Sequence, residues 1–247
     1  MNLVWIDADA PLPDPAGALP GGLLAAGSDL STHRLAEAYR LGIFPWFSPG
    51  DPVLWWSPDP HMVLACDALR ISHSLAKRLR RIARTETLPN AECHITLNAD
   101  FSQVIRECSA RSQTWITPNI IAVYEAWHHQ GRVHSIETWQ GNRLVGGLYG
   151  VSLGRFFFGE SMFTRVSDAG KIALVYLVRY LQAHGVPYID CQQETAHLAT
   201  LGASPIPRTE FLTHLDALKN LPGPPWGRGR LTADGRLIDE TTLTMRA

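Results

Sequence analysis

The stretch that decides the fold is residues 133–163, which read VHSIETWQGNRLVGGLYGVSLGRFFFGESMF. The side chains over residues 133–139 form two alternating sets, as on the two faces of a β-strand. One set is Val133, Ser135, Glu137 and Trp139, and the other is His134, Ile136 and Thr138. The Gly-Asn pair at 141–142 and the Leu-Gly pair at 153–154 adopt tight-turn conformations at little cost. The pattern therefore predicts three strands joined by two tight turns.

The third of these strands ends in an unusual way. Three phenylalanines at 156–158 are followed directly by Gly159, Glu160 and Ser161. A charged side chain after such an apolar run conflicts with a plain core strand, and conflicts of this kind often mark functional positions. A strand that simply reaches the surface would show the same residues, so the pattern alone leaves both interpretations open.

Composition restricts the class of protein. The 247 residues are 45% hydrophobic and 18% charged, with a formal net charge of −1, as in a globular protein. Because the net charge is close to zero, contact with nucleic acid would need a local basic patch. We expect a cytoplasmic protein, since the N-terminus lacks a signal-peptide pattern and no stretch resembles a membrane span. Four cysteines without CxxC spacing predict neither a disulfide framework nor a zinc site.

The segments around the three strands predict an α+β fold. Periodicity and caps indicate strands at 93–97 and 186–192, and helices at 32–41, 68–84, 101–108, 119–130, 169–184 and 208–218. The helix and strand that span 169–192 imply a crossover, which would place Asp190 and Gln192 at one edge and on one face of the sheet.

Three units are expected along the chain. They are a small Pro-rich and aromatic domain over residues 1–65, a basic helix with a linker over 66–89, and an α+β domain over 90–247. The tail from Pro222 is rich in Gly, Pro and Arg, and we expect it to be loose.

The helix at 68–84 carries basic residues on one side. Its apolar face is formed by Leu75, Leu79 and Ile82, and no acidic residue occurs over 68–85. A charged run is usually only a solvated helix face, but such faces normally mix signs, so contact with the phosphates of a polyanion is an equal alternative. The candidate phosphate-binding residues are Lys77, Arg78, Arg80, Arg81 and Arg84.

Common catalytic motifs are missing. Residues 159–163 lack the second glycine of a serine-hydrolase elbow, and the histidines lack metal-ligand spacing. The remaining candidates are polar groups next to strand ends, namely Glu160, Ser161, Asp190 and Gln192. A carboxylate and an amide beside an apolar wall could bind and orient an amine, which suits acyl transfer to nitrogen. Alternatively, Asp190 and Gln192 could simply satisfy backbone groups.

Ten short runs lie in order over roughly residues 20–215. They are GLLA at 22–25, DLS at 29–31, YRLGIFPWF at 39–47, LWWSP at 54–58, TWIT at 114–117, HSIE at 134–137, LVGGLYG at 144–150, GESMF at 159–163, IDCQ at 189–192 and LGA at 201–203. In combination they make the chain resemble the leucyl/phenylalanyl-tRNA–protein transferase family.

The resemblance implies both a fold and an activity. The fold would be a small N-terminal domain followed by a GNAT-like acyltransferase domain, with a mixed, largely antiparallel sheet flanked by helices. The activity would be transfer of Leu, Phe or Met from aminoacyl-tRNA to the α-amino group of proteins that begin with Arg or Lys, creating a degradation signal. The resemblance implies no cofactor and no metal, and we expect a monomer.

The resemblance also assigns roles by position. Asp190 and Gln192 would be the catalytic pair, and the basic helix would bind tRNA. Substrate would be bound by six residues: Trp46 and Trp115 at the aminoacyl-adenosine end, Leu148 and Phe157 in the apolar side-chain pocket, and Glu160 and Ser161 on the side where the acceptor enters.

Some positions depart from the family pattern. His61 stands where arginine is usual, Ser28 where a second glycine is usual, and Gly170 where serine is usual, while the loop before Trp115 is short.

Two other functions stay open. An acyl-CoA-dependent N-acetyltransferase is disfavoured because no RxxGxG/A loop precedes the long helix. A non-catalytic RNA-binding module is the third possibility, because the basic helix would survive a loss of activity.

Overall fold

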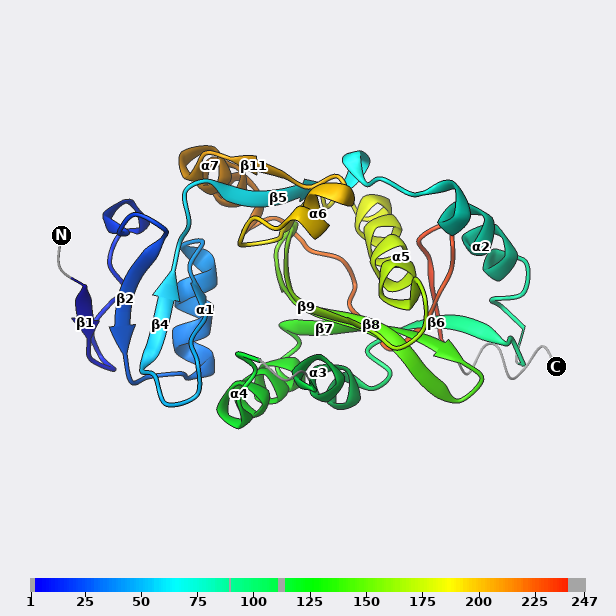
Figure 1. Ribbon diagram of the computed structural model, residues 1–247, viewed down its shortest axis with the longest axis horizontal. Helices are drawn as coiled ribbons and strands as arrows, with labels where there is room; N and C mark the ends of the chain where they lie inside the picture. Colours follow the sequence, from blue (N-terminus) through cyan, green and yellow to red (C-terminus); the bar gives the residue numbers. More distant parts are fainter. Residues whose placement is uncertain (1–2, 89, 111–113, 240–247) are drawn as a thin grey trace.

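The computed structural model describes residues 3–88, 90–110 and 114–239, and it contains two β-sheets (Figure 1). The smaller sheet lies at the N-terminal end and has the strand order β1-β2-β4-β3. Its strands are β1 Val4–Ile6, β2 Leu23–Gly27, β3 Phe44–Pro45 and β4 Val53–Trp56. Helix α1, Thr32–Arg40, connects β2 to β3, and Gly42 follows it with a φ of 68°, a conformation that glycine adopts easily at a helix end.

The larger sheet has nine strands in the order β11-β5-β10-β9-β8-β7-β6-β12-β13. Its strands are β5 His61–Ala65, β6 Cys93–Leu97, β7 Val133–Gln140, β8 Arg143–Leu153, β9 Phe156–Thr164, β10 Tyr188–Asp190, β11 Ser204–Ile206, β12 Gly229–Leu231 and β13 Leu237–Ile238. The predicted three-stranded unit is confirmed as β7-β8-β9. Only β9 and β10 pair in parallel among the described strands of this sheet, so it is mixed and largely antiparallel.

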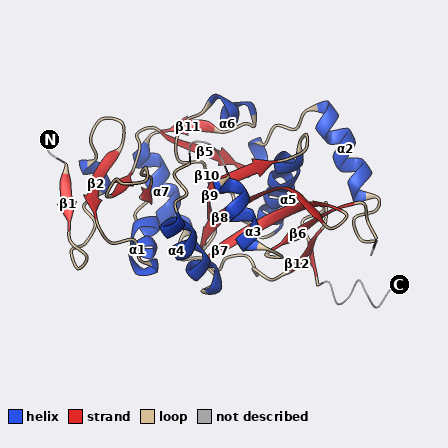
Figure 2. Cartoon of the chain, turned by 60° about the horizontal axis from the view of Figure 1, so that its bottom comes forward, coloured by secondary structure: helices blue, strands red, loops and turns tan. Residues whose placement is uncertain are grey.

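Helices cover both faces of the larger sheet, which confirms the α+β fold (Figure 1). They are α2 His73–Ala83, α3 Phe101–Ser109, α4 Pro118–His129, α5 Ala169–Ala183, α6 Ala196–Thr200 and α7 Arg208–Leu218. One buried cluster contains apolar residues of α1, α3, α4 and α7 together with the small sheet, and a second contains residues of α2 and α5. Figure 2 shows α1, α4 and α7 gathered near the boundary between the two sheets.

A β-bulge in β9 resolves the unusual strand end. Tyr149 pairs with Ser161 and Gly150 pairs with Gly159, so Glu160 is an extra residue without a partner on β8. Phe157 and Met162 therefore pack in the same apolar cluster although they are five residues apart, which an unbroken strand would not allow. The bulge lets one strand keep two apolar faces while it presents a carboxylate.

The structure corrects four details of the sequence-based predictions. The basic helix begins at His73 rather than at 68, because the Ser72 hydroxyl accepts a hydrogen bond from the Leu75 amide and caps it there. The sequence predicts that Asp168 caps the helix that starts at 169, but it has a φ of 64° and makes no side-chain cap, since its carboxylate faces Arg78. Gln192 lies beyond β10 and has a φ of 62°, so it does not share an extended face with Asp190.

The fourth correction concerns the tail from Pro222, which is not loose over its described part. Strand β12 pairs with β6, and Trp226 stacks on His134 with a centroid separation of 4.1 Å. The Trp226 indole also donates a hydrogen bond of 2.7 Å to the Ser152 hydroxyl. A composition rich in Gly and Pro suggested disorder, but one aromatic anchor and an open sheet edge are enough to order the segment.

Two further observations concern the position of β5 and the hydropathy of the helices. Strand β5 belongs to the larger sheet, although residues 61–65 follow directly after the small one. Among the residues that the structure describes, no helix is long and apolar enough to cross a membrane.

Candidate active site

A cavity of about 340 Å³ lies beside the bulge, between the larger sheet, α5 and α6. Strands β8, β9 and β10 contribute Leu148, Phe157 and Ile189 to its wall, and α5 contributes Leu174 and Leu177. Its lining therefore consists of aliphatic and aromatic groups over most of the sheet side. Glu160 and Gln192 supply polar groups next to this apolar wall. A concave apolar site with a few polar groups is the usual form of a ligand-binding site.

Glu160 is held by three hydrogen bonds from three different elements. The Tyr39 hydroxyl of α1 donates to Oε1 at 2.6 Å, and the Tyr124 hydroxyl of α4 donates to Oε2 at 3.3 Å. The Gln192 side-chain amide donates to Oε1 at 3.1 Å. The two tyrosine hydroxyls also lie 2.7 Å apart. The bulge, two helices and the turn after β10 thus fix one carboxylate at the cavity wall.

The surroundings of Glu160 change its acidity. Burial raises the pKa of the Glu160 carboxyl to about 7, and the negative charge of Asp190 raises it as well, while the hydrogen bonds from Tyr39 and Gln192 oppose the increase. Burial beside this carboxylate also raises the pKa of the Tyr39 and Tyr124 hydroxyls, which therefore stay protonated and able to donate. A carboxyl that titrates near neutral pH inside a cavity is typical of functional sites.

Gln192 is placed by a tight turn at the end of β10. Its backbone N–H donates to Asp190 Oδ1 at 2.7 Å, which closes an Asx turn. Its φ of 62° is uncommon for a residue other than glycine, and such conformations cluster at functional sites. Because the amide nitrogen donates to Glu160, the amide oxygen Oε1 is the Gln192 atom that is left to accept a hydrogen bond from a ligand.

Most of the residues singled out in the sequence come together at this cavity. Six of the eight candidates line it: Trp115, Leu148, Phe157, Glu160, Ser161 and Gln192. Asp190 is only 1% exposed and is not part of the described lining, so its carboxylate reaches the cavity through Gln192. Trp46 is not part of that lining either. It is 40% exposed and packs against Trp56, whose indole donates to the Trp46 carbonyl.

Sequence reasoning missed several groups around the site. Tyr39 and Tyr124 come from helices that the sequence predicts, but nothing in the sequence links them to Glu160. A buried tyrosine hydroxyl needs a hydrogen-bond partner, and this requirement was the available signal. His61 was noted only as a departure from a family pattern, yet it is fully buried and its Nε2 lies 3.5 Å from Asp190 Oδ2.

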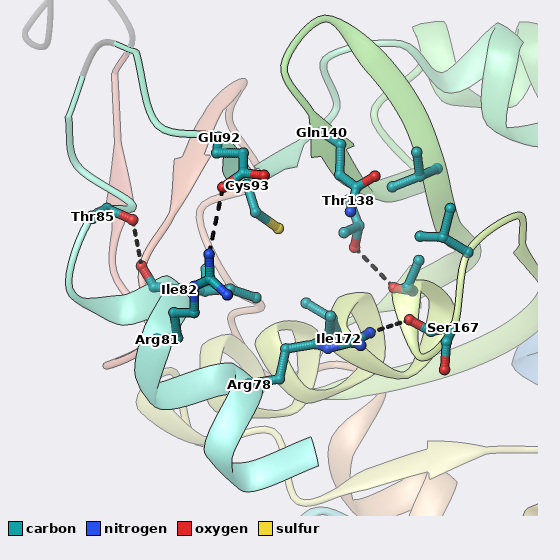
Figure 3. A pocket seen from close by; sticks show the side chains of 13 residues that line it. Arg78, Arg81, Ile82, Thr85, Glu92, Cys93, Thr138, Gln140, Ser167 and Ile172 are labelled. Carbon is teal, nitrogen blue, oxygen red and sulfur yellow. Dashed lines mark hydrogen bonds and ion pairs between the residues drawn. The ribbon is translucent and has the colours of Figure 1, made fainter. Parts of the chain in front are cut away.

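The five candidate basic residues lie on α2 or, for Arg84, directly after it, and all are exposed, but Arg78 and Arg81 have acidic partners elsewhere in the chain. Figure 3 shows Arg78 reaching to Ser167 and Arg81 reaching to Glu92 across a cleft of about 400 Å³. Arg78 also faces Asp168 at 3.5 Å, and the Arg81–Glu92 distance is 3.7 Å. The uninterrupted positive charge of the sequence is therefore partly neutralised in the fold. Within the described ranges, Lys77, Arg80 and Arg84 make no ion pair.

The charged surface and the cavity lie on different sides of one helix. Figure 1 shows α5 between α2 and α6. Helix α5 lines the cavity through Leu174 and Leu177, while its Arg179 and Gln182 face a second depression that α2 shares. A long ligand that contacted both places would have to pass around α5.

Comparison with known proteins identifies the same family that the ten sequence runs resemble. The family model described as leucyl/phenylalanyl-tRNA protein transferase matches residues 63–216, and the model of that family's N-terminal domain matches residues 28–59. The leucyl/phenylalanyl-tRNA–protein transferase of Bordetella avium (strain 197N) is 53% identical over 97% of this chain and 98% of its own length. The protein of that name from Bordetella bronchiseptica is 54% identical over 96% of each chain.

One solved structure shows only a distant likeness. The C-terminal domain of a putative lysylphosphatidylglycerol synthetase from Agrobacterium fabrum aligns with a TM-score of 0.37 and 12% identity, over 83% of this chain and 66% of that one. This likeness is too weak to establish a shared fold. The family matches, by contrast, cover most of the sequence and include every residue that lines the cavity. The chain therefore belongs to the leucyl/phenylalanyl-tRNA–protein transferase family.

Proposed function

We propose that this protein transfers a leucyl or phenylalanyl group from aminoacyl-tRNA to the α-amino group of an acceptor protein, with the cavity beside Glu160 as the reaction site. The observation that carries the proposal is the meeting of an apolar pocket with the Glu160–Gln192 pair in a chain of this family. The apolar wall is suited to an uncharged side chain, and the polar pair is suited to an amine.

The acyl side chain would lie against Leu148, Phe157 and Leu177, which line the cavity. An apolar pocket distinguishes side chains only weakly, by about 1–3 kcal/mol per methylene, so acceptance of Leu, Phe and also Met is reasonable. Trp115 at the cavity wall offers an aromatic face for the terminal adenosine. We assign Trp46 a role at the same end of the substrate, on its exposed aromatic surface near the small sheet.

The reaction needs an amine that is oriented and able to lose a proton. The acceptor nitrogen attacks the ester carbonyl, a C–N bond forms, and the ester C–O bond to the ribose breaks. The ribose oxygen takes up the proton that the amine loses. Gln192 Oε1 can accept a hydrogen bond from the attacking amine and aim it at the carbonyl carbon. Glu160 supplies negative charge for a cationic acceptor, which favours N-terminal Arg or Lys.

Asp190 would act through Gln192 rather than on substrate. Its Oδ1 holds the Gln192 backbone N–H, and its side chain is buried away from the cavity. We therefore treat Asp190 as the residue that positions the Gln192 turn, and Ser161 as a polar contact at the acceptor side.

Four further points belong to the proposal. The exposed basic residues of α2 would contact tRNA phosphates: Lys77, Arg78, Arg80, Arg81 and Arg84. The α+β domain after the small sheet would be GNAT-like, and the small sheet with its helix would be a separate N-terminal domain. The enzyme would act as a cytoplasmic monomer. Its product would carry a new N-terminal Leu or Phe and serve as a degradation signal.

One experiment separates the proposal from the two alternatives. Purified protein is incubated with Leu-charged tRNA or acetyl-CoA and an Arg-initiated peptide, and the peptide mass is measured. Addition of leucine from the tRNA supports the proposal. Addition of acetyl from acetyl-CoA alone would support an N-acetyltransferase, and tRNA binding without any product would support a non-catalytic RNA-binding module.

A further inference from the structure

His61 and Asp190 form a buried contact that the cavity does not include. Both side chains are almost completely buried, at 0% and 1% exposure, and Nε2 of His61 lies 3.5 Å from Oδ2 of Asp190. Neither of these two atoms has a hydrogen-bond partner among the described residues, and their 3.5 Å contact is within ion-pair distance. Each therefore depends on the other for any compensation of its burial.

The other ring nitrogen of His61 determines which protons are present. Nδ1 lies 3.1 Å from the carbonyl oxygen of Pro58, and a carbonyl oxygen only accepts hydrogen bonds. Nδ1 must therefore carry a proton. If it carried the only proton of the ring, Nε2 would direct a lone pair at the Asp190 carboxylate, and two acceptors would face each other in a buried space. A proton on Nε2 removes this conflict, because the N–H group can then donate to the carboxylate oxygen.

The ring of His61 is also fixed in orientation. It stacks on Phe211 with a centroid separation of 3.8 Å and an interplanar angle of 4°, and the edge of Phe44 closes another side. The charged or titratable groups nearby are Asp190 on the facing strand, Glu160 beyond Gln192, and the Arg208–Asp59 pair at the turn before β5. Among these groups, Asp190 is the one that the Nε2 atom faces.

The contact is connected to the cavity by two hydrogen bonds. Asp190 uses Oδ2 toward His61 and Oδ1 toward the Gln192 backbone N–H, and the Gln192 side chain donates to Glu160. The strands reinforce the same connection, since Met62 N–H donates to the Gln192 carbonyl and Cys191 N–H donates to the Met62 carbonyl. Rotation of the Asp190 carboxylate would release the left-handed turn at Gln192.

We propose that His61 is a positioning residue, whose Nε2–H group locks the Asp190 carboxylate and thereby holds Gln192 in the orientation needed for amine attack. This inference rests on the proposed function for the role of Gln192. His61 touches no substrate, so its removal should lower the rate of transfer without weakening the binding of aminoacyl-tRNA.

The kinetic test compares three variants. His61→Phe keeps an aromatic ring on Phe211 but removes the donor, and we expect kcat for Leu transfer to an Arg-initiated peptide to fall at least tenfold, with KM for Leu-tRNA within twofold of wild type. His61→Gln restores an N–H donor and should recover most of the lost rate. His214→Phe is the matched control, because His214 lies on the same helix as Phe211 and stacks on Tyr188. It should behave as wild type.

A spectroscopic measurement tests the contact without activity. In ¹⁵N-histidine spectra of the wild-type protein, Nε2 of His61 should carry a proton, and its signal should shift in Asp190→Asn. A bare Nε2 would overturn the proposal, and so would a folded His61→Phe with normal kcat, or a His61→Gln no better than His61→Phe. If wild-type protein transferred no leucine, the proposed function would fail instead, and the spectra would still decide the His61–Asp190 contact.

Discussion

Glu160 shows how one carboxylate acquires a functional setting from its neighbours. Two tyrosines from different helices and one glutamine donate to it, while burial opposes its ionisation. The result is a group that changes charge near neutral pH in a cavity whose other walls are mostly apolar. None of these partners is close to Glu160 in the sequence, so the fold alone creates the site.

The raised pKa of Glu160 leads to a prediction about pH. Below a pH of about 7 the carboxyl is protonated and neutral, and it no longer attracts a cationic acceptor; above that pH it is charged. Transfer to an Arg-initiated peptide should therefore rise between pH 6 and pH 8. The acceptor amine also titrates in this range, so Glu160→Gln is measured in parallel to isolate the contribution of the carboxyl. We expect a flatter profile and a reduced preference for Arg- and Lys-initiated peptides; identical profiles and an unchanged preference would refute this role.

At the scale of elements, the bulge in β9 decides where Glu160 points. The extra residue reverses which face of the sheet the alternating side chains point to. Phe158 before the bulge and Met162 after it therefore pack in the two different apolar clusters. The close approach of β8 to this point leaves no space for a side chain at Gly150. A Cβ there would lie 2.2 Å from the Phe158 carbonyl oxygen and 2.5 Å from the Phe157 ring.

A pair of alanine variants tests this packing. Gly150→Ala should reduce the free energy of unfolding by about 1–3 kcal/mol, because the strands must separate to admit the methyl group. Gly159→Ala is the matched control, since Gly159 is the register partner of Gly150 and its Cβ would make only ordinary contacts at 3.5 Å. Urea denaturation measures both variants. Equal stability of the two would contradict the assigned register.

Helix α2 presents two kinds of basic residue. Arg78 and Arg81 have acidic partners, whereas Lys77, Arg80 and Arg84 make no ion pair within the described parts of the chain. Exposed ion pairs contribute little to stability but reduce the charge available to a polyanion. The unpaired group should therefore dominate the salt dependence of tRNA binding.

Charge reversal of the unpaired residues tests this expectation. In the double variant Arg80→Glu/Arg84→Glu, the slope of log binding constant against log salt should become shallower by about 2, because each lost phosphate contact removes about one unit. Arg40→Glu serves as the control, since Arg40 lies on α1 at the opposite end of the molecule from α2 (Figure 1). A slope unchanged from wild type in the double variant would exclude α2 from the tRNA contact.

At the scale of the whole molecule, the sequence predicted local structure better than long-range arrangement. The three-stranded unit and most helices follow from turn residues, caps and periodicity, and the crossover to β10 follows from a helix succeeded by a strand. The hydrogen bonds of Glu160 and the His61–Asp190 contact could not be predicted, because each joins segments far apart in the chain. In the sequence, the bulge is visible only as the polar residues that follow Phe158. The alternation of side chains along a strand does not by itself reveal that one extra residue is inserted.

The ordered tail gives a prediction about the stability of the entire protein. Trp226 stacks on His134 and fastens the segment that lays β12 along β6. Trp226→Ala should cost about 2–3 kcal/mol of unfolding free energy, which is less than for a fully buried tryptophan. Trp5→Ala is the control, because Trp5 is 59% exposed and should matter by no more than about 0.5 kcal/mol. Equal effects in thermal or urea unfolding would mean that the tail does not contribute to the core.

The central claim is that Gln192, held by Asp190 and Glu160, aims the acceptor amine at the aminoacyl ester. The most direct measurement is single-turnover transfer of leucine from Leu-tRNA to an Arg-initiated peptide by Gln192→Ala, together with its affinity for Leu-tRNA. The account predicts a rate at least about 100-fold below wild type, as expected for loss of a group that handles the reacting amine, with affinity within twofold. A variant that transfers leucine at the wild-type rate, or that loses rate only in proportion to tRNA affinity, would contradict it.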